Sequence, residues 1–78
     1  PQVSIYPNPS TGLFYCLFNQ VTSGTVKLFD ITGKLMFQNS FYNKEQINLN
    51  LDSYNNGVYF LEITTDNHSK STTKLIKM

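Results

Sequence analysis

The side chains most often used in catalysis are few in this sequence. One histidine, His68, follows the polar stretch TTDN, and one cysteine, Cys16, lies inside the apolar run LFYCLF. Acid–base catalysis needs two titratable groups at a set distance, and nucleophilic catalysis needs a base beside the nucleophile. Neither a Ser-His-Asp order nor a pair of suitably spaced carboxylates is evident, so we predict no catalytic site. Cys16 is predicted to be a small buried hydrophobic residue.

Metal and cofactor chemistry is not indicated either. A single cysteine excludes an internal disulfide bond, and one histidine with one cysteine is too few for a structural zinc site. The oxygen-rich pattern of a calcium loop is missing. Asp30, Asp52 and Asp66 lie among turn-forming residues and are predicted to shape turns. We therefore predict no enzymatic activity, no metal and no cofactor.

The charges of the chain nearly balance. Six Lys and Arg residues against five Asp and Glu residues give a net charge of +1, too small an excess for electrostatic binding of nucleic acid. The longest apolar run, residues 13–18, is far shorter than the roughly 20 residues that span a bilayer as a helix. We therefore expect no nucleic-acid partner and no membrane insertion.

The elements that would position any site are predicted to be strands, because apolar residues alternate with period two along most of the chain. INLNL (47–51) alternates cleanly, and GLFYCLFN (12–19) is apolar on both faces, as in a central strand. Turn-forming residues recur about every ten residues, which predicts a sandwich or a barrel in one domain. Seven strands are predicted, at residues 3–6, 13–19, 25–30, 34–41, 46–51, 58–65 and 70–77.

The turn DITGK (30–34) has a recognisable mechanism. Asp30 occupies the first turn position, and Gly33 stands where a type I turn with a bulge requires positive φ. This stretch is therefore predicted to join two strands as a hairpin.

The stretch NNGVY (55–59) allows two interpretations. Asn-Gly is a strong hairpin signal, yet the stretch also resembles the corner of immunoglobulin-like sandwiches, where a tyrosine hydroxyl bonds to upstream backbone. We favour the corner, with Tyr59 buried, because six residues separate Leu51 from Val58. Gly57 is predicted to be a backbone requirement in either case.

The stretch YPNPSTG (6–12) is predicted to form a rigid corner. Each proline disfavours helical backbone in the residue before it, and no proline can donate a hydrogen bond to a sheet. The first strand must therefore end here or lie at an edge, and Gly12 is expected to supply positive φ for the reversal. The residues of this structural motif are Tyr6, Pro7, Asn8, Pro9 and Gly12.

Four motifs follow one another in a fixed order along the chain. They are YPNPSTG, LFDITGKL (28–35), NGVYFLEI (56–63) and KLIK (74–77). Together they resemble the type A C-terminal sorting domain of the type IX (Por) secretion system of Bacteroidota. The resemblance implies a seven-strand immunoglobulin-like antiparallel β-sandwich. It also implies a secretion signal that directs a cargo protein across the outer membrane and is usually removed by a surface sortase.

The resemblance also implies partners and a location for the single sorting domain at residues 1–78. The partners are the type IX translocon, its outer-membrane shuttle and sortase components, and a cargo domain that precedes this one in a longer precursor. The implied location is the periplasm in transit, then the cell surface or the medium. Residues 1–2 are interpreted as the remnant of a linker.

The tail residues Lys74, Leu75, Ile76 and Lys77 are the predicted recognition site. An extended tail can add to the edge of a receptor sheet, with its lysines facing acidic groups. The structural alternative is that lysine on an edge strand merely discourages aggregation. Edge pairing also predicts a homodimer of the isolated domain. A direct receptor contact of the YPNPSTG motif is a further alternative.

A different function is an immunoglobulin- or fibronectin-like accessory module of a secreted protein. Such a module would space domains, adhere or bind carbohydrate, and exposed tyrosines such as Tyr42 and Tyr54 could stack on sugars. A sorting signal must lie at the C-terminus and depend on its last residues, whereas an accessory module would not.

Overall fold

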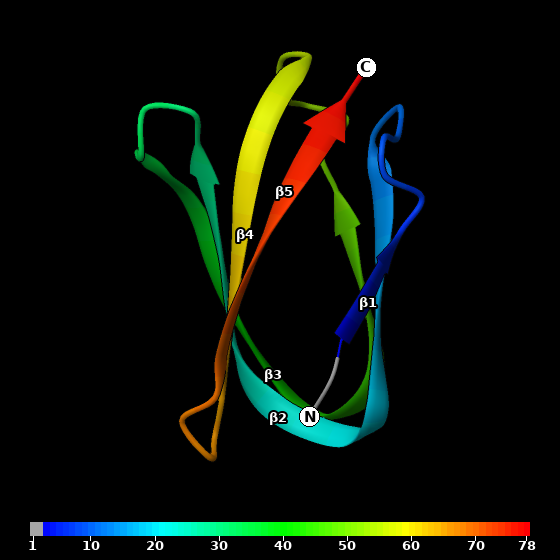
Figure 1. The fold of residues 1–78 in the computed structure, drawn as a ribbon, viewed down its shortest axis with the longest axis vertical. Coiled ribbons are helices and arrows are strands. Elements are labelled where there is room, and N and C mark those ends of the chain that lie inside the picture. Colours follow the sequence, from blue (N-terminus) through cyan, green and yellow to red (C-terminus); the bar gives the residue numbers. More distant parts are fainter. Residues whose placement is uncertain (1–2) are drawn as a thin grey trace.

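The computed structural model describes residues 3–78, which form antiparallel β-structure (Figure 1). The strands are β1 (Val3–Tyr6), β2 (Leu13–Asp30), β3 (Leu35–Asn50), β4 (Gly57–Thr65) and β5 (Lys70–Lys77). All four strand pairings are antiparallel. The prediction of an all-β antiparallel fold is confirmed, while the predicted linker remnant at residues 1–2 lies outside the described residues. No described residue belongs to a helix of the length and apolarity that a membrane crossing requires.

Residues 3–78 form five strands, whereas the sequence predicted seven. The predicted strands 13–19 and 25–30 are two arms of β2, and 34–41 and 46–51 are two arms of β3. The turn-forming residues between the arms produce bends instead of chain reversals. At these bends the register between β2 and β3 shifts twice, at Leu17/Thr22 and at Thr22/Gly24, and Asn43 adopts a φ of 51°.

The bends fold the sheet over on itself into two layers. The first arm of β2 lies between β1 and the second arm of β3, and these form the three-stranded layer. The second arm of β2 lies between the first arm of β3 and β4, and β4 also pairs with β5. These form the four-stranded layer. Figure 1 shows β2 and β3 curving together from one layer into the other.

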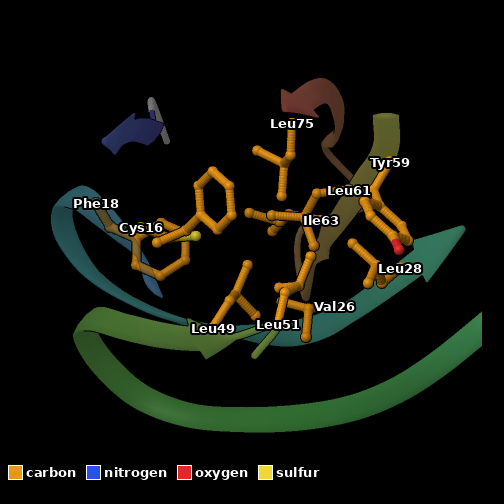
Figure 2. Packing of buried hydrophobic residues seen from close by; sticks show 11 residues of the cluster. Cys16, Phe18, Val26, Leu28, Leu49, Leu51, Tyr59, Leu61, Ile63 and Leu75 are labelled. Carbon is orange, nitrogen blue, oxygen red and sulfur yellow. The ribbon is translucent and has the colours of Figure 1, made fainter. Parts of the chain in front are cut away.

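The core fills the space between the layers (Figure 2). Alternate residues of β2 and β4 point inward, as the period of two requires. The buried hydrophobic residues are Phe14, Cys16, Phe18, Val26, Leu28, Leu49, Leu51, Tyr59, Leu61, Ile63 and Leu75. Burial raises the pKa of the Cys16 thiol to about 12, so this residue packs as a hydrophobic side chain, as predicted.

The predicted hairpin at residues 30–34 is confirmed. Gly33 has a φ of 90°, and its N–H donates to the carbonyl of Asp30 at 3.0 Å. The carboxylate of Asp30 accepts hydrogen bonds from the backbone and hydroxyl of Thr32 and from the backbone of Lys34. The Thr32 hydroxyl is the main reason why the pKa of Asp30 lies below its usual value, and the Lys34 backbone bond also contributes.

The predicted tyrosine corner is also confirmed. Tyr59 is buried, and its hydroxyl donates to the carbonyl of Asn55 at 2.6 Å. Gly57 has a φ of 152°, which a residue with a side chain rarely adopts. The segment therefore turns a corner between the layers, as the six residues between Leu51 and Val58 suggested.

The prediction for Gly12 was wrong in its reason. Gly12 is not among the residues with positive φ. A Cβ at this position would instead collide with the carboxylate of Asp52, and the Gly12 carbonyl accepts the Leu51 N–H at 2.7 Å. A side chain at this position would therefore require the exposed Asp52 carboxylate to move, whereas the Asp52 backbone is not in the way.

Candidate functional site

The first and the last of the four motifs lie side by side. The loop between β1 and β2 runs along the outer edge of β5, next to the C-terminus (Figure 1). Contacts between them join residues separated by 66 and 68 positions in the sequence. The YPNPSTG and KLIK motifs therefore form one structural unit, which we call the tail clamp: residues 8–10 with residues 74–78.

Asn8 is the central side chain of the tail clamp. Its Nδ2 donates to the carbonyl of Lys74 at 2.8 Å, and its Oδ1 accepts the N–H of Ile76 at 3.0 Å. A side-chain amide carries a donor and an acceptor, as a peptide group does. The Asn8 side chain thus makes the two hydrogen bonds that the backbone of a neighbouring strand would otherwise make to β5. Two cis peptide bonds lie next to it: Tyr6–Pro7 comes just before Asn8, and Asn8–Pro9 joins Asn8 to the following residue.

Ser10 continues the tail clamp through its backbone. Its N–H donates to the carbonyl of Ile76 at 2.9 Å, and its carbonyl accepts the N–H of Met78 at 2.9 Å. The Ser10 hydroxyl donates to the Leu13 carbonyl at 2.6 Å and accepts the Gly12 N–H at 3.1 Å. Ser10 is buried, and sequence reasoning missed it because nothing distinguishes it from an ordinary turn-forming serine.

Two of the four predicted tail residues point inward. Leu75 has no exposed surface and belongs to the core. Lys77 is also buried, and its Nζ donates to the Tyr54 carbonyl at 2.9 Å and to Oδ1 of Asn56 at 3.1 Å. A buried ammonium group needs such acceptors. Lys77 therefore attaches the tail to the corner that precedes β4.

The other two tail residues point outward. Lys74 is exposed, and Ile76 has 37% of its surface exposed. The outer backbone edge of residues 74–78 is already hydrogen-bonded to residues 8–10. Strand addition by a receptor at this edge would therefore require residues 8–10 to leave it. In the folded chain, this part of the tail offers side chains, not free backbone groups.

Apart from Pro9, which belongs to the tail clamp, the remaining sequence candidates lie away from it or at its margin. Tyr6 is 47% exposed and contacts Tyr15, with ring centroids 5.7 Å apart, and Pro7 and Pro9 are exposed. His68 is exposed in the turn between β4 and β5. Among the tyrosines considered for sugar stacking, Tyr42 is exposed. Tyr54 is packed against Phe37 and Tyr59 at centroid distances of 6.3 and 6.1 Å.

A hollow of about 330 Å³ lies beside the tyrosine corner. Its lining includes Asp30, Met36, Tyr54 and Val58. Asp30 is the only carboxylate among the described residues of the lining, and its oxygen is engaged in its own turn. Within residues 3–78 no three metal-ligating side chains gather. The hollow therefore lacks the paired groups that acid–base catalysis requires.

Comparison with known sequences gives a family match over nearly the whole chain. A sequence model described as "Secretion system C-terminal sorting domain" matches residues 4–78. The chain is 28% identical over 75 residues to ulvan lyase NLR42 of Nonlabens ulvanivorans. It is 31% identical over 75 residues to an endo-acting ulvan lyase of Formosa agariphila. Each match covers 95% of this chain, which spans 14% of the length of these curated relatives.

Comparison with solved structures defines the fold. A DUF3244 family protein of Bacteroides vulgatus, described as having an immunoglobulin-like β-sandwich fold, superposes with a TM-score of 0.84 at 16% identity, covering 97% of this chain and 84% of that one. CopC of Methylosinus trichosporium gives a TM-score of 0.56 at 16% identity, covering 96% and 81%. The curled sheet is thus an immunoglobulin-like arrangement.

Proposed function

Because this chain belongs to the family of secretion system C-terminal sorting domains, we propose that the type IX secretion machinery recognises its tail in the folded state. A domain of this family is a C-terminal sorting signal for type IX secretion, and it directs the protein that carries it to the cell surface or the extracellular space.

The tail clamp is the observation that supports this proposal. It occupies the outer backbone edge of residues 74–78, while Leu75 and Lys77 are buried. Recognition then uses the side chains that point outward, Lys74 and Ile76. Leu75 and Lys77 act indirectly, because they hold the strand against the core and the corner.

The components that read the tail are the translocon, its outer-membrane shuttle and the sortase. The domain is attached to an N-terminal cargo domain and crosses the periplasm with it, and domains of this kind are usually removed by the sortase at the surface. It acts without catalysis of its own: an engaged carboxylate in the hollow and a buried, protonated thiol at Cys16 support this part of the proposal. Residues 1–78 act as one sorting domain.

Self-association through edge pairing would use the other half of β5. Among the described residues, the outer edge of Lys70–Thr73 has no strand partner, whereas residues 74–78 are covered. Two copies would pair antiparallel along this short segment. Such a homodimer of the isolated domain is limited to four residues per strand.

The test is export of a fluorescent passenger with a periplasmic signal at its front and residues 1–78 at its back. Truncation at Thr73 is a poor probe because it also removes core and corner contacts. The substitutions Lys74→Glu and Ile76→Ser together change only the outward pair. Val21→Ser with Lys44→Glu is the matched control, since both residues are exposed at the bend of β2 and β3.

We expect export of the unmodified fusion to depend on an intact translocon. Export should fall when Lys74→Glu and Ile76→Ser, the tail pair, are introduced together. It should persist when the control pair, Val21→Ser and Lys44→Glu, is introduced. Normal export of the tail pair would contradict recognition through Lys74 and Ile76. Periplasmic retention of the unmodified, folded fusion would contradict sorting itself and favour an accessory module.

A further inference from the structure

The outer face of the four-stranded layer carries contiguous apolar side chains that reach the tail. In the strand register, Phe29 lies opposite both Leu35 and Phe60, and Val58 lies opposite Ile76. Directly opposite residues of antiparallel strands point to the same face. These residues alternate with inward residues of the core, so they face outward. We call this set the apolar band: Phe29, Leu35, Val58, Phe60 and Ile76.

The apolar band has no cover among the described residues. Leu35 is 46% exposed and Ile76 37% exposed, and the other three members are half-buried. The strand order and the contacts between elements place no segment of residues 3–78 over this face. A contiguous apolar surface of this kind marks an interaction site more often than isolated exposed residues do.

The charges around the apolar band have one predominant sign. Lys74 lies opposite Phe60, and Lys27 lies opposite Glu62. Glu62 is the one carboxylate that points outward from the described strands of this face, and it contacts Lys70 at 3.8 Å. Three lysines against one glutamate leave two positive charges in excess (3 − 1 = 2). Such a rim favours a partner surface with carboxylates.

The outer face of the three-stranded layer differs in chemistry. It presents Leu13, Tyr15 and Leu17 of β2 beside Tyr6 of β1, and opposite them stand the amides of Gln46, Asn48 and Asn50. No charged side chain occurs in these paired positions. This face therefore serves as an internal control of similar apolar character without the lysines.

We propose that the apolar band and its lysine rim form the surface on which the folded domain docks to a protein of the translocation machinery. The partner presents apolar side chains flanked by carboxylates. This inference rests on the proposed function and extends it: Lys74 and Ile76 are one margin of a larger site with Phe60 near its centre. A lipid surface is the less favoured occupant, because basic lipid-binding segments carry about four to eight clustered Lys or Arg residues.

The test uses the export assay with substitutions away from the tail. Phe60→Ser removes the central aromatic ring, and Leu35→Ser alters the margin farthest from β5 and leaves the core intact. Leu17→Ser, 41% exposed on the other face, is the matched control. We expect export to fall about tenfold for Phe60→Ser, as for an aromatic residue at the centre of an interface, and less for Leu35→Ser. Circular dichroism of the purified fusions verifies folding, and if Phe60→Ser unfolds, Leu35→Ser decides.

The outcomes separate this inference from the function on which it rests. Export of both band variants at the unmodified level would overturn the docking surface and leave the sorting role intact. An equal fall for Leu17→Ser would also overturn it, because face specificity would be lost. Retention of the unmodified fusion would overturn both. Co-sedimentation with phosphatidylethanolamine–phosphatidylglycerol vesicles that is lost in Phe60→Ser would replace the protein partner by a lipid surface.

Discussion

Two of the outer strands of the sandwich, β5 and β3, are protected in different ways. The outer edge of β5 is hydrogen-bonded to the loop that follows β1 over residues 74–78. The outer edge of β3 has no strand partner among residues 3–78 along its whole length, Leu35–Asn50. The edge of β5 is closed by the Asn8 side chain and the Ser10 backbone, whereas the edge of β3 is open.

The open edge is protected by its shape and polarity. Near its middle, β3 bends at Asn43, with Lys44 and Glu45 exposed beside it. Bends, bulges and charges at an edge discourage pairing between molecules. Under the proposed function, the contacts along β5 have a different role, which is to fix the positions of the tail side chains. If the closed edge depends on Leu75, Lys77 and Asn8, substitutions of these residues should have larger effects than matched substitutions on the open edge.

The largest effect is expected for Leu75→Ala. Its side chain is fully buried, and truncation of a buried leucine costs about 2–5 kcal/mol in the free energy of unfolding. Leu35→Ala on the open edge should cost less than about 0.5 kcal/mol, as is usual for exposed positions. Urea unfolding of the 78-residue chain measures both, and similar losses at the two sites would contradict the difference between the edges.

Lys77→Met should have the next largest effect. It keeps an apolar stem but leaves the Tyr54 carbonyl and the Asn56 amide oxygen without their donor. Unpaired polar groups at a partly buried site cost about 1–3 kcal/mol. Lys44→Met at the bend of the open edge is the control and should change the urea midpoint little. A neutral Lys77→Met variant would show that the ammonium group does not hold the tail.

Asn8→Ala should cost about 1–2 kcal/mol, because two hydrogen bonds of modest net value are lost. A more specific consequence is faster hydrogen exchange of the Ile76 amide, because its N–H donates a hydrogen bond to Oδ1 of Asn8 at 3.0 Å. Asn39→Ala, an exposed asparagine of β3, should leave that amide unchanged. Equal exchange rates in Asn8→Ala and the unmodified chain would exclude the tail clamp in solution.

The smallest effect concerns the hairpin that leads into the open edge. Hydrogen bonds, chiefly from the Thr32 hydroxyl, lower the pKa of Asp30 in the folded state. A lowered folded pKa adds stability above the unfolded value of about 3.9, and this is lost as pH falls through the folded pKa. Asp30→Asn should therefore flatten the acid limb of the stability curve slightly. Urea unfolding between neutral and acid pH measures this. The same loss of stability with falling pH in Asp30→Asn and the unmodified chain would contradict a stabilising role of the Asp30 carboxylate.

Local chemistry explains which features could be predicted from the sequence. The hairpin at residues 30–34 and the corner at Tyr59 depend on neighbours within five residues, so their sequences were sufficient. The bends of β2 and β3 were mistaken for reversals, because polar residues and Gly24 resemble turns. Gly24 is instead required where the backbone of β4 at Thr64 and Thr65 passes too close for a Cβ.

The arrangement of the tail could not be predicted, because it depends on contacts across almost the whole chain. Nothing near Asn8 in sequence indicates that its amide bonds to Lys74 and Ile76. The sequence does not indicate the inward position of Lys77 either, since a lysine at the end of a strand is usually exposed. The family resemblance identified the two motifs, and the structure supplies the reason for their occurrence together.

Export of the fluorescent passenger carrying Asn8→Ala tests the central claim most directly. Asn8→Ala loosens the tail without altering Lys74, Leu75, Ile76 or Lys77, and Asn39→Ala is the control on the open edge. If the machinery reads a held strand, Asn8→Ala should reduce translocon-dependent export while Asn39→Ala does not. Export of Asn8→Ala at or above the unmodified rate would contradict the account, because a loose tail would then be the recognised form.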